Sequence, residues 1–407
     1  MNPTLAFLLA LGIIILAAKT FGYLSTRLGQ PAVLGELLIG ILLGPTLLDM
    51  LHWPFFQGAH LEEVVRDLAE LGVIFLMFIA GLEVDLETMR RSGRPAVLAG
   101  VLGVAVPILL GALVSLPFGF QPLDGIFIGL MMAATSVSIS AQTMMELGVL
   151  CSPVGMALLG AAVVDDVLVI VLLSIFTALT GEGGGIGHIL WMLFRMLLVM
   201  GAIVGVGMRL LPRLPVRVDR LPISEGVMAL VVVVMLLFAW SAEALGGVAA
   251  ITGAFLAGLF IARSPLHHYI KERMHILSYS WVVPVFFVDI GLEVNARAIS
   301  AEGLGLTGAL ILAAVVSKVV GCGIGGLLGS FSFRDALRLG VGMTSRGEVG
   351  LIVASIGLTT GLIGADIFSS VVLMVLVTIL ITPILLRRLY RPPKQRGTRR
   401  ALPEGGV

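Results

Sequence analysis

The stretch AAVVDDVLVIVLL, residues 161–173, places Asp165 and Asp166 side by side inside an otherwise apolar run. A carboxylate at the centre of a membrane-spanning helix costs roughly 2.5–3.5 kcal/mol on the scale from membrane-insertion experiments. Two adjacent aspartates at that depth therefore indicate a functional site, provided that the run crosses a membrane.

The composition of the whole chain favours that condition. Hydrophobic residues make up 58% of the 407 residues and charged residues only 13%, with a mean hydropathy of +1.08. Because an average soluble domain carries about 25% charged residues, the chain is interpreted as an all-α polytopic membrane protein. The net charge of +1 gives no reason to expect a nucleic-acid partner. The cysteines, Cys151 and Cys322, have no metal-ligand spacing.

Apolar runs of about 20 residues, bounded by Gly, Pro and charged clusters, predict thirteen transmembrane helices. Their ranges are 5–23, 32–50, 67–85, 95–118, 123–147, 153–180, 188–211, 223–242, 246–263, 276–295, 303–330, 334–361 and 364–388. The first run is expected to be a retained helix, because Lys19 follows it and no basic region precedes it as in a secretory signal. A short basic tail, residues 389–407, follows the last helix.

The distribution of basic residues agrees with this count, since cytoplasmic loops are enriched in Lys and Arg. Of the 26 basic residues, 20 fall in the odd-numbered connections and the C-terminal tail, against Arg66 and Arg297 in the even-numbered ones. This pattern predicts an N-terminus outside and a C-terminus in the cytoplasm.

Three pairs of similar segments indicate an internal repeat. The pairs are GLEVD 81–85 with GLEVN 291–295, GELLIGILL 35–43 with GAFLAGLFI 253–261, and MAATS 132–136 with GVGMTS 340–345. They predict two five-helix repeats at about 32–180 and about 246–388, joined by linker helices at about 188–242. An odd number of spans separates corresponding helices, so the repeats are inverted, as in many secondary transporters.

Two of the predicted helices carry polar clusters at equivalent repeat positions. The helix at 123–147 contains GLMMAATSVSISAQTMMEL, with Thr135 and Ser136, and the helix at 334–361 contains GVGMTSRGEVGLIVASIG, with Thr344. We expect both helices to be interrupted, because broken helices in membranes line cavities with unpaired carbonyls. The alternative is that the small and hydroxyl residues mediate close helix packing.

The two aspartates are expected to have different partners, because neighbours on a helix point about 100° apart. Lys318, in a predicted span, is the natural ion-pair partner for one of them. Asp165 could then be half of a fixed salt bridge, whereas Asp166 is the stronger candidate for a functional group.

Other intramembrane charges are secondary candidates. Arg346 and Glu348, two residues apart, are expected to pair near the second interrupted helix. Glu36 is interpreted as a helix-packing or cavity-rim acid, and Asp289 as an acid that could approach the cavity.

Together these motifs resemble the monovalent cation:proton antiporter-2 superfamily, in particular its bacterial sodium/proton antiporter branch. The similar segments are VLGELLIGILLGP, FLMFIAGLEVDL, the ATS of the first interrupted helix, VVDD, SKVVG and TSRGEVGLIVA. The resemblance implies the sodium/proton antiporter fold with two crossed broken helices, interleaved core and panel domains, and a homodimer formed through the panel in the lipids of a bacterial inner membrane.

The resemblance also implies roles for individual residues. Asp166 would bind the monovalent cation or a proton, Asp165 would pair with Lys318, and Thr135 and Ser136 would lie beside the ion. Potassium efflux systems of this superfamily carry Gln at the first position of the aspartate pair and a nucleotide-binding domain. This chain has Asp165 there and about 19 residues after the last helix, so no nucleotide-binding domain is expected. Asp289 stands where the family more often has a small or neutral residue.

The predicted function is electrogenic exchange of a monovalent cation, sodium first and lithium or potassium as alternatives, for protons, with a role in pH homeostasis. No enzymatic activity and no resident cofactor are expected. Alternative interpretations are a potassium/proton antiporter, a cation channel, a sodium-coupled organic-anion symporter on the related ten-helix fold, and an intramembrane aspartyl protease using Asp166 with Asp289.

Overall fold

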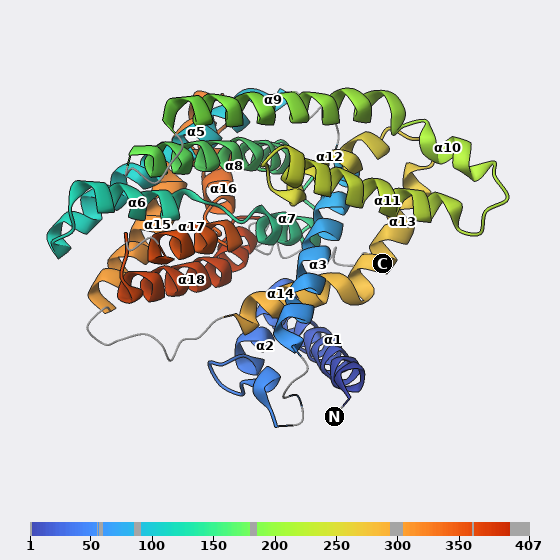
Figure 1. The fold of residues 1–407 in the computed structure, drawn as a ribbon, viewed down its shortest axis with the longest axis horizontal. Coiled ribbons are helices and arrows are strands. Elements are labelled where there is room, and N and C mark those ends of the chain that lie inside the picture. Colours follow the sequence, from blue (N-terminus) through green and yellow to red (C-terminus); the bar gives the residue numbers. More distant parts are fainter. Residues whose placement is uncertain are drawn as a thin grey trace, which may run out of the picture.

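The computed structural model describes residues 2–54, 56, 60–84, 91–179, 185–293, 304–359 and 362–390. In these ranges all regular secondary structure is helical, without a β-strand, and some neighbouring helices, such as α17 and α18, run side by side (Figure 1). Nine helices in the described residues are long and apolar enough to cross a membrane, and three shorter apolar helices accompany them. The all-α membrane class is therefore confirmed.

The helices follow the order of the predicted spans. Their bounds are α1 (Pro3–Arg27), α2 (Ala32–Leu43), η1 (Met50–His52), α3 (Leu61–Glu83), α5 (Gly93–Ser115), η2 (Leu116–Phe118), α6 (Pro122–Ala133), α7 (Val137–Glu146), α8 (Pro153–Leu179), α9 (Gly185–Leu210), α10 (Leu214–Asp219), α11 (Gly226–Trp240), η3 (Ser241–Leu245), α12 (Ala250–Ile261), α13 (His267–Leu277), η4 (Ser278–Val282), α14 (Val283–Leu292), α15 (Leu304–Leu328), α16 (Phe333–Gly342), α17 (Glu348–Thr359) and α18 (Ala365–Tyr390).

Each of the thirteen predicted ranges contains helix, and three of them differ clearly in extent. The helix of the range 67–85 begins earlier, at Leu61. The range 32–50 is helical only to Leu43, because Gly44 is extended and the following Pro45 cannot continue a helix. The range 276–295 is preceded by helix from His267, which runs through a π-helical turn into α14. The thirteen membrane crossings themselves remain a prediction.

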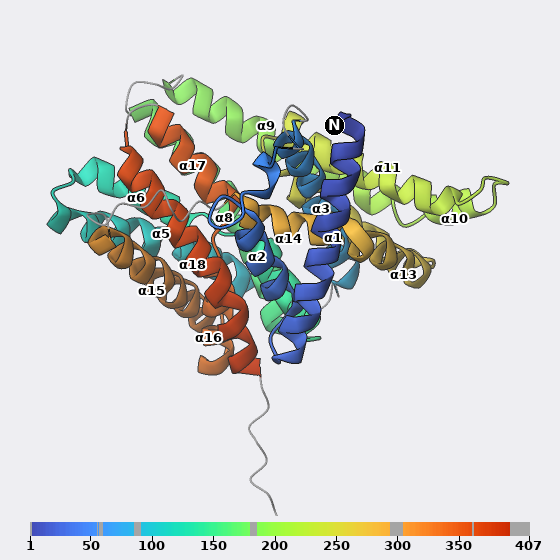
Figure 2. The same ribbon diagram turned by 90° about the horizontal axis from the view of Figure 1, so that it is seen from below.

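The helices form two packed groups. The first bundle consists of α5–α8 and α15–α18, in which α5 packs on α15, α6 and α8. The second bundle consists of α1–α3 and α11–α14, in which α3 packs on α12 and α2 packs on α14. Figure 2 shows most of the first bundle on the left and most of the second on the right. Helix α9 contacts both, and α7 of the first bundle contacts α2 and α3 of the second.

Close glycine contacts hold the second bundle together. A Cβ at Gly81 of α3 would lie 2.2 Å from the carbonyl oxygen of Phe255 on α12, and a Cβ at Gly258 of α12 would lie 2.1 Å from that of Phe78 on α3. Only glycine therefore permits the two backbones to approach this closely.

The same arrangement recurs between α2 and α14. A Cβ at Gly40 would lie 2.2 Å from the carbonyl oxygen of Val288, and one at Gly291 would lie 2.6 Å from Cα of Gly40. In the predicted repeat, Gly81 corresponds to Gly291 and Gly40 to Gly258. The GLEV segment of each repeat thus packs on the first helix of the other repeat. Two copies related by a two-fold axis would pack on each other in this reciprocal way. The inverted repeat remains a prediction, which this packing supports.

Candidate ion-binding site

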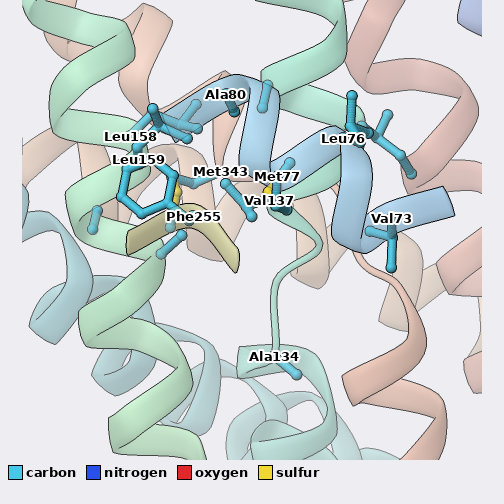
Figure 3. Packing of buried hydrophobic residues seen from close by; sticks show 14 of the residues in the cluster. Val73, Leu76, Met77, Ala80, Ala134, Val137, Leu158, Leu159, Phe255 and Met343 are labelled. Atoms are coloured by element: carbon cyan, nitrogen blue, oxygen red, sulfur yellow. The ribbon is translucent and has the colours of Figure 1, made fainter. Parts of the chain in front are cut away.

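Both helices that carry polar clusters are interrupted in the structure. Helix α6 ends at Ala133 and α7 begins at Val137, with Ala134 and Ser136 in extended conformations between them. Figure 3 shows this extended link between the labelled residues Ala134 and Val137. Helix α16 ends at Gly342, and α17 begins only at Glu348.

Local sequence explains where the first halves begin and end. Helix α6 starts at a capping box between Gln121 and Asp124, and α16 starts where Ser332 accepts a hydrogen bond from the backbone N–H of Asp335 at 3.2 Å. At the far ends, hydroxyls bond to local backbone: Thr135 donates to Ala133 O at 3.3 Å, and Thr344 donates to Val341 O. Such bonds compete with helix continuation.

The two interruptions touch each other. The backbone N–H of Ser136 donates to the carbonyl oxygen of Ser345 at 2.9 Å, and the Ser140 hydroxyl donates to the carbonyl oxygen of Gly342. A Cβ at Gly347 would lie 2.5 Å from Cβ of Ser136. The crossing therefore requires glycine at position 347.

The structure separates the two aspartates of α8. Asp165 is fully buried, and one of its oxygens lies 2.6 Å from Nζ of Lys318 on α15, which is fully buried as well. Its other oxygen, Oδ2, is buried without a hydrogen-bond partner among the described residues. The expected pair is thus in contact, and a single hydrogen bond joins it.

Asp166 instead borders a small cavity between the two bundles. The cavity has a volume of about 20 Å³, and roughly 10–15 Å³ suffices for one water molecule. Its lining combines side chains of α3, α7, α8 and α12, namely Met77, Val137, Leu159, Ala162, Val163, Asp166, Ile251, Thr252 and Phe255. Figure 3 shows Met77, Val137, Leu159 and Phe255 converging. Of the two aspartates, Asp166 is therefore the one that borders a cavity large enough for a water molecule.

Thr135 and Ser136 lie in the interruption itself and are both buried. They do not line the cavity, although the next residue, Val137, does. The structure therefore places these two hydroxyl residues next to the cavity wall.

Arg346 lies in the second interruption and donates hydrogen bonds to backbone carbonyls. Its guanidinium is fully buried and donates to Ala314 O at 2.8 Å and to Met343 O at 3.4 Å, just after the end of α16. A positive charge there opposes the negative end of the half-helix dipole. The expected pairing with Glu348 falls outside the described residues, because it depends on the Glu348 side chain.

Glu36 and Asp289 are not brought to the cavity. Glu36 is buried on α2, with an oxygen 3.9 Å from Nζ of Lys19, and Asp289 is half-buried on α14. Neither lines the space beside Asp166. The structure gives no support to a direct role for either acid.

A polar contact between the bundles was not anticipated from the sequence. Glu146, at the end of α7, accepts hydrogen bonds from the backbone N–H groups of Ala32 at 2.6 Å and Val33 at 3.2 Å. Gln142 donates to the same carboxylate at 2.9 Å and accepts from the Tyr279 hydroxyl of η4. The only sequence signal is that Gln142 and Glu146 are four residues apart on one helix face.

Comparison with known proteins agrees with this arrangement. The sequence model of the family described as "Sodium/hydrogen exchanger, transmembrane" matches residues 12–391. The Na(+)/H(+)-K(+) antiporter GerN of Bacillus cereus is 35% identical over 381 residues, covering 94% of this chain and 95% of that protein. An Na(+)/H(+) antiporter of Enterococcus hirae is 35% identical over 384 residues, covering 92% of this chain and 96% of that protein.

The fold also resembles a solved structure. The sodium proton antiporter MjNhaP1 from Methanocaldococcus jannaschii, known from an electron-microscopy map, superposes with a TM-score of 0.73 at 18% identity, covering 95% of this chain and 96% of that one. At this identity the likeness concerns the fold alone. The family match over nearly the whole chain identifies it as a member of the sodium/hydrogen exchanger family.

Proposed function

We propose that this protein exchanges a monovalent cation, sodium first, for protons across the membrane by alternating access. The observation that carries the proposal is the position of Asp166, an intramembrane carboxylate at a water-sized cavity between the two bundles. A buried carboxylate is costly when charged, and either a proton or a cation neutralises it. The two therefore compete for one site, and reorientation of the neutralised site produces exchange.

The first bundle corresponds to the expected core domain and the second to the panel. Support comes from the crossed interruptions and Asp166, which lie in the first bundle, and from the few helix contacts between the bundles. The half-helix ends and the Thr135–Ser136 link supply oxygens and dipole ends beside the cavity. In this proposal the core carries the ion and the panel remains fixed.

Lys318 makes the exchange electrogenic. When a cation occupies the site, Asp165 releases Lys318, which loses its proton, so that two protons move for each cation. The 2.6 Å hydrogen bond makes Asp165 the partner that Lys318 would have to lose, and the second oxygen of Asp165, which has no hydrogen-bond partner among the described residues, supports a carboxylate that can take a new partner when Lys318 leaves.

The cavity argues against the alternatives. Organic ligands occupy pockets of about 300–1,000 Å³, whereas this cavity measures about 20 Å³. An aspartyl protease would need Asp289 beside Asp166, and Asp289 does not line the cavity. Potassium remains a second candidate cation, because GerN is named as an Na(+)/H(+)-K(+) antiporter.

The remaining proposals concern assembly and orientation. The protein forms a homodimer through the second bundle in a bacterial inner membrane, with the N-terminus outside and the C-terminus in the cytoplasm. Figure 2 supports an odd number of crossings, because the N-terminus and the end of α18 lie at opposite edges of the molecule. Light scattering of the purified protein and labelling of single cysteines at each terminus test both points.

The decisive experiment is cation-dependent dissipation of a pH gradient in proteoliposomes, with Na⁺, Li⁺ and K⁺ compared. Asp166→Asn should abolish the exchange, whereas Asp289→Asn, the same change in an acid away from the cavity, should retain it. Full exchange by Asp166→Asn would refute the assignment. Lys318→Gln should remove the voltage dependence, and unchanged voltage dependence would refute the proposed stoichiometry.

A further inference from the structure

Thr252 brings a second polar side chain to the cavity of Asp166. It is the third residue of α12 in the second bundle, is only 3% exposed, and lines the cavity together with Asp166 of the first bundle. The other lining side chains, from Met77 to Phe255, are apolar. The carboxylate and the hydroxyl therefore border one small space from opposite bundles.

The Thr252 hydroxyl differs from those of the other buried threonines. In the described residues, each of the other six donates a hydrogen bond, namely Thr135, Thr143, Thr307, Thr344, Thr378 and Thr382. Thr252 makes no such bond in this part of the chain. Polar groups in protein interiors are nearly always paired. Because Thr252 borders a cavity large enough for a water molecule, an occupant of that cavity can supply the missing hydrogen bond.

We infer that Thr252 provides an oxygen ligand to the cation held by Asp166, directly or through one water molecule, and thereby contributes to ion selectivity. This inference rests on the proposed function. A small hard cation that leaves water needs oxygen ligands to replace its hydration shell. In this apolar space Thr252 provides the only neutral side-chain oxygen among the lining residues.

Because Thr252 and Asp166 belong to different bundles, the Thr252 hydroxyl can bind the cation in only part of the transport cycle. Thr252 belongs to the panel and Asp166 to the core, so reorientation of the core separates them. The ligand is therefore present when the cavity lies between α8 and α12, and absent after the movement. Lithium and sodium, which are more strongly hydrated than potassium, depend on it more.

Thr252→Val, which replaces the hydroxyl with a methyl group, tests the inference in proteoliposomes. We expect the KM for Na⁺ to rise about tenfold, as the loss of one ligand contact implies, with a smaller rise for K⁺ and an unchanged maximal rate. Thr252→Ser should restore the wild-type KM. Thr382→Val is the matched control, because the Thr382 hydroxyl bonds only within its own helix, to Thr378 O at 2.7 Å.

A second measurement covers the case in which Thr252→Val folds poorly in the membrane. Sodium should raise the thermal unfolding temperature of purified wild type and Thr252→Ser at lower concentrations than it does for Thr252→Val or Thr252→Ala. An unchanged KM, a fall in maximal rate alone, or equal sodium stabilisation of all variants would overturn the inference. Absence of exchange by the wild type, or exchange by Asp166→Asn, would instead overturn the proposed function.

Discussion

The backbone N–H of Ser136 donates a hydrogen bond of 2.9 Å to the carbonyl oxygen of Ser345, which joins the interruption of one helix to that of another. Both groups belong to stretches that have left their helices and need partners inside an apolar bundle. The crossing is thus held by main-chain atoms. The two stretches approach this closely because Gly347 has no side chain.

Gly347→Ala should disrupt this crossing. The added Cβ would lie 2.5 Å from Cβ and 2.8 Å from Oγ of Ser136, so the interruptions must move apart. Overpacking of this kind costs typically about 1–3 kcal/mol. We expect a lower unfolding temperature and at least about a tenfold loss of exchange in proteoliposomes.

Gly350→Ala provides the control for that variant. Its Cβ would meet nothing closer than Met131 O at 3.4 Å, and alanine favours the helix that contains it. Its exchange should equal that of the wild type. Equal exchange by Gly347→Ala would show that the crossing tolerates separation.

Breaking the buried pair of Asp165 and Lys318 should destabilise the protein more than removing both charges. A buried charge that loses its partner costs roughly 3–5 kcal/mol, whereas neutral replacement of a whole pair is often nearly neutral. We expect Asp165→Asn and Lys318→Gln each to lower the thermal unfolding temperature in detergent, and the double variant to recover part of the loss. Additive losses in the double-mutant cycle would contradict a coupled pair.

Glu146→Ala should loosen the start of α2. The carboxylate accepts hydrogen bonds from the N–H groups of Ala32 and Val33, and no side chain of α2's own N-cap does so. Loss of a helix cap costs about 0.5–2 kcal/mol. Hydrogen exchange should accelerate in the first turn of α2, and Glu146→Gln, which keeps an acceptor oxygen, should show a smaller effect.

Glu272→Ala is the control for this change, because Glu272 is an exposed acid on α13. Glu272→Ala should leave the rate of hydrogen exchange in the first turn of α2 unchanged. If Glu146→Ala also leaves it unchanged, the capping contact does not stabilise α2.

Gly81→Ala and Gly291→Ala should have similar effects, because each residue packs at the same point of the predicted repeat. An added Cβ would lie 2.2 Å from Phe255 O in the first case and 2.5 Å from the Ile41 nitrogen in the second. Both variants should lose stability in thermal unfolding, whereas Gly12→Ala, with nothing within 4 Å of its Cβ, should not. A large loss at one site alone would argue against equivalent packing.

The sequence by itself determined the class of the protein and the residues most worth examining. The sequence signals are apolar runs, the basic residues between them and the charges inside them. Each has its own free energy of transfer into the membrane, which depends little on its neighbours in the fold. For the same reason the hydroxyl-rich and glycine-containing stretches around Thr135 and Thr344 marked the interruptions correctly. The helix end at Leu43 was missed although Gly44 and Pro45 mark it in the sequence, and the helix start at His267 was missed because the sequence HHYIKERMHIL of α13 is mostly polar.

Only the tertiary structure decided which of these groups meet. Asp165 contacts Lys318 and Asp166 borders a cavity because of the way α8 is rotated about its axis between α15 and α12. A helix that is apolar on all sides has no periodicity from which this rotation can be predicted. The contacts of Thr252 with the cavity and of Glu146 with α2 join helices far apart in the chain. Such contacts arise from the packing of two bundles, and no local pattern encodes them.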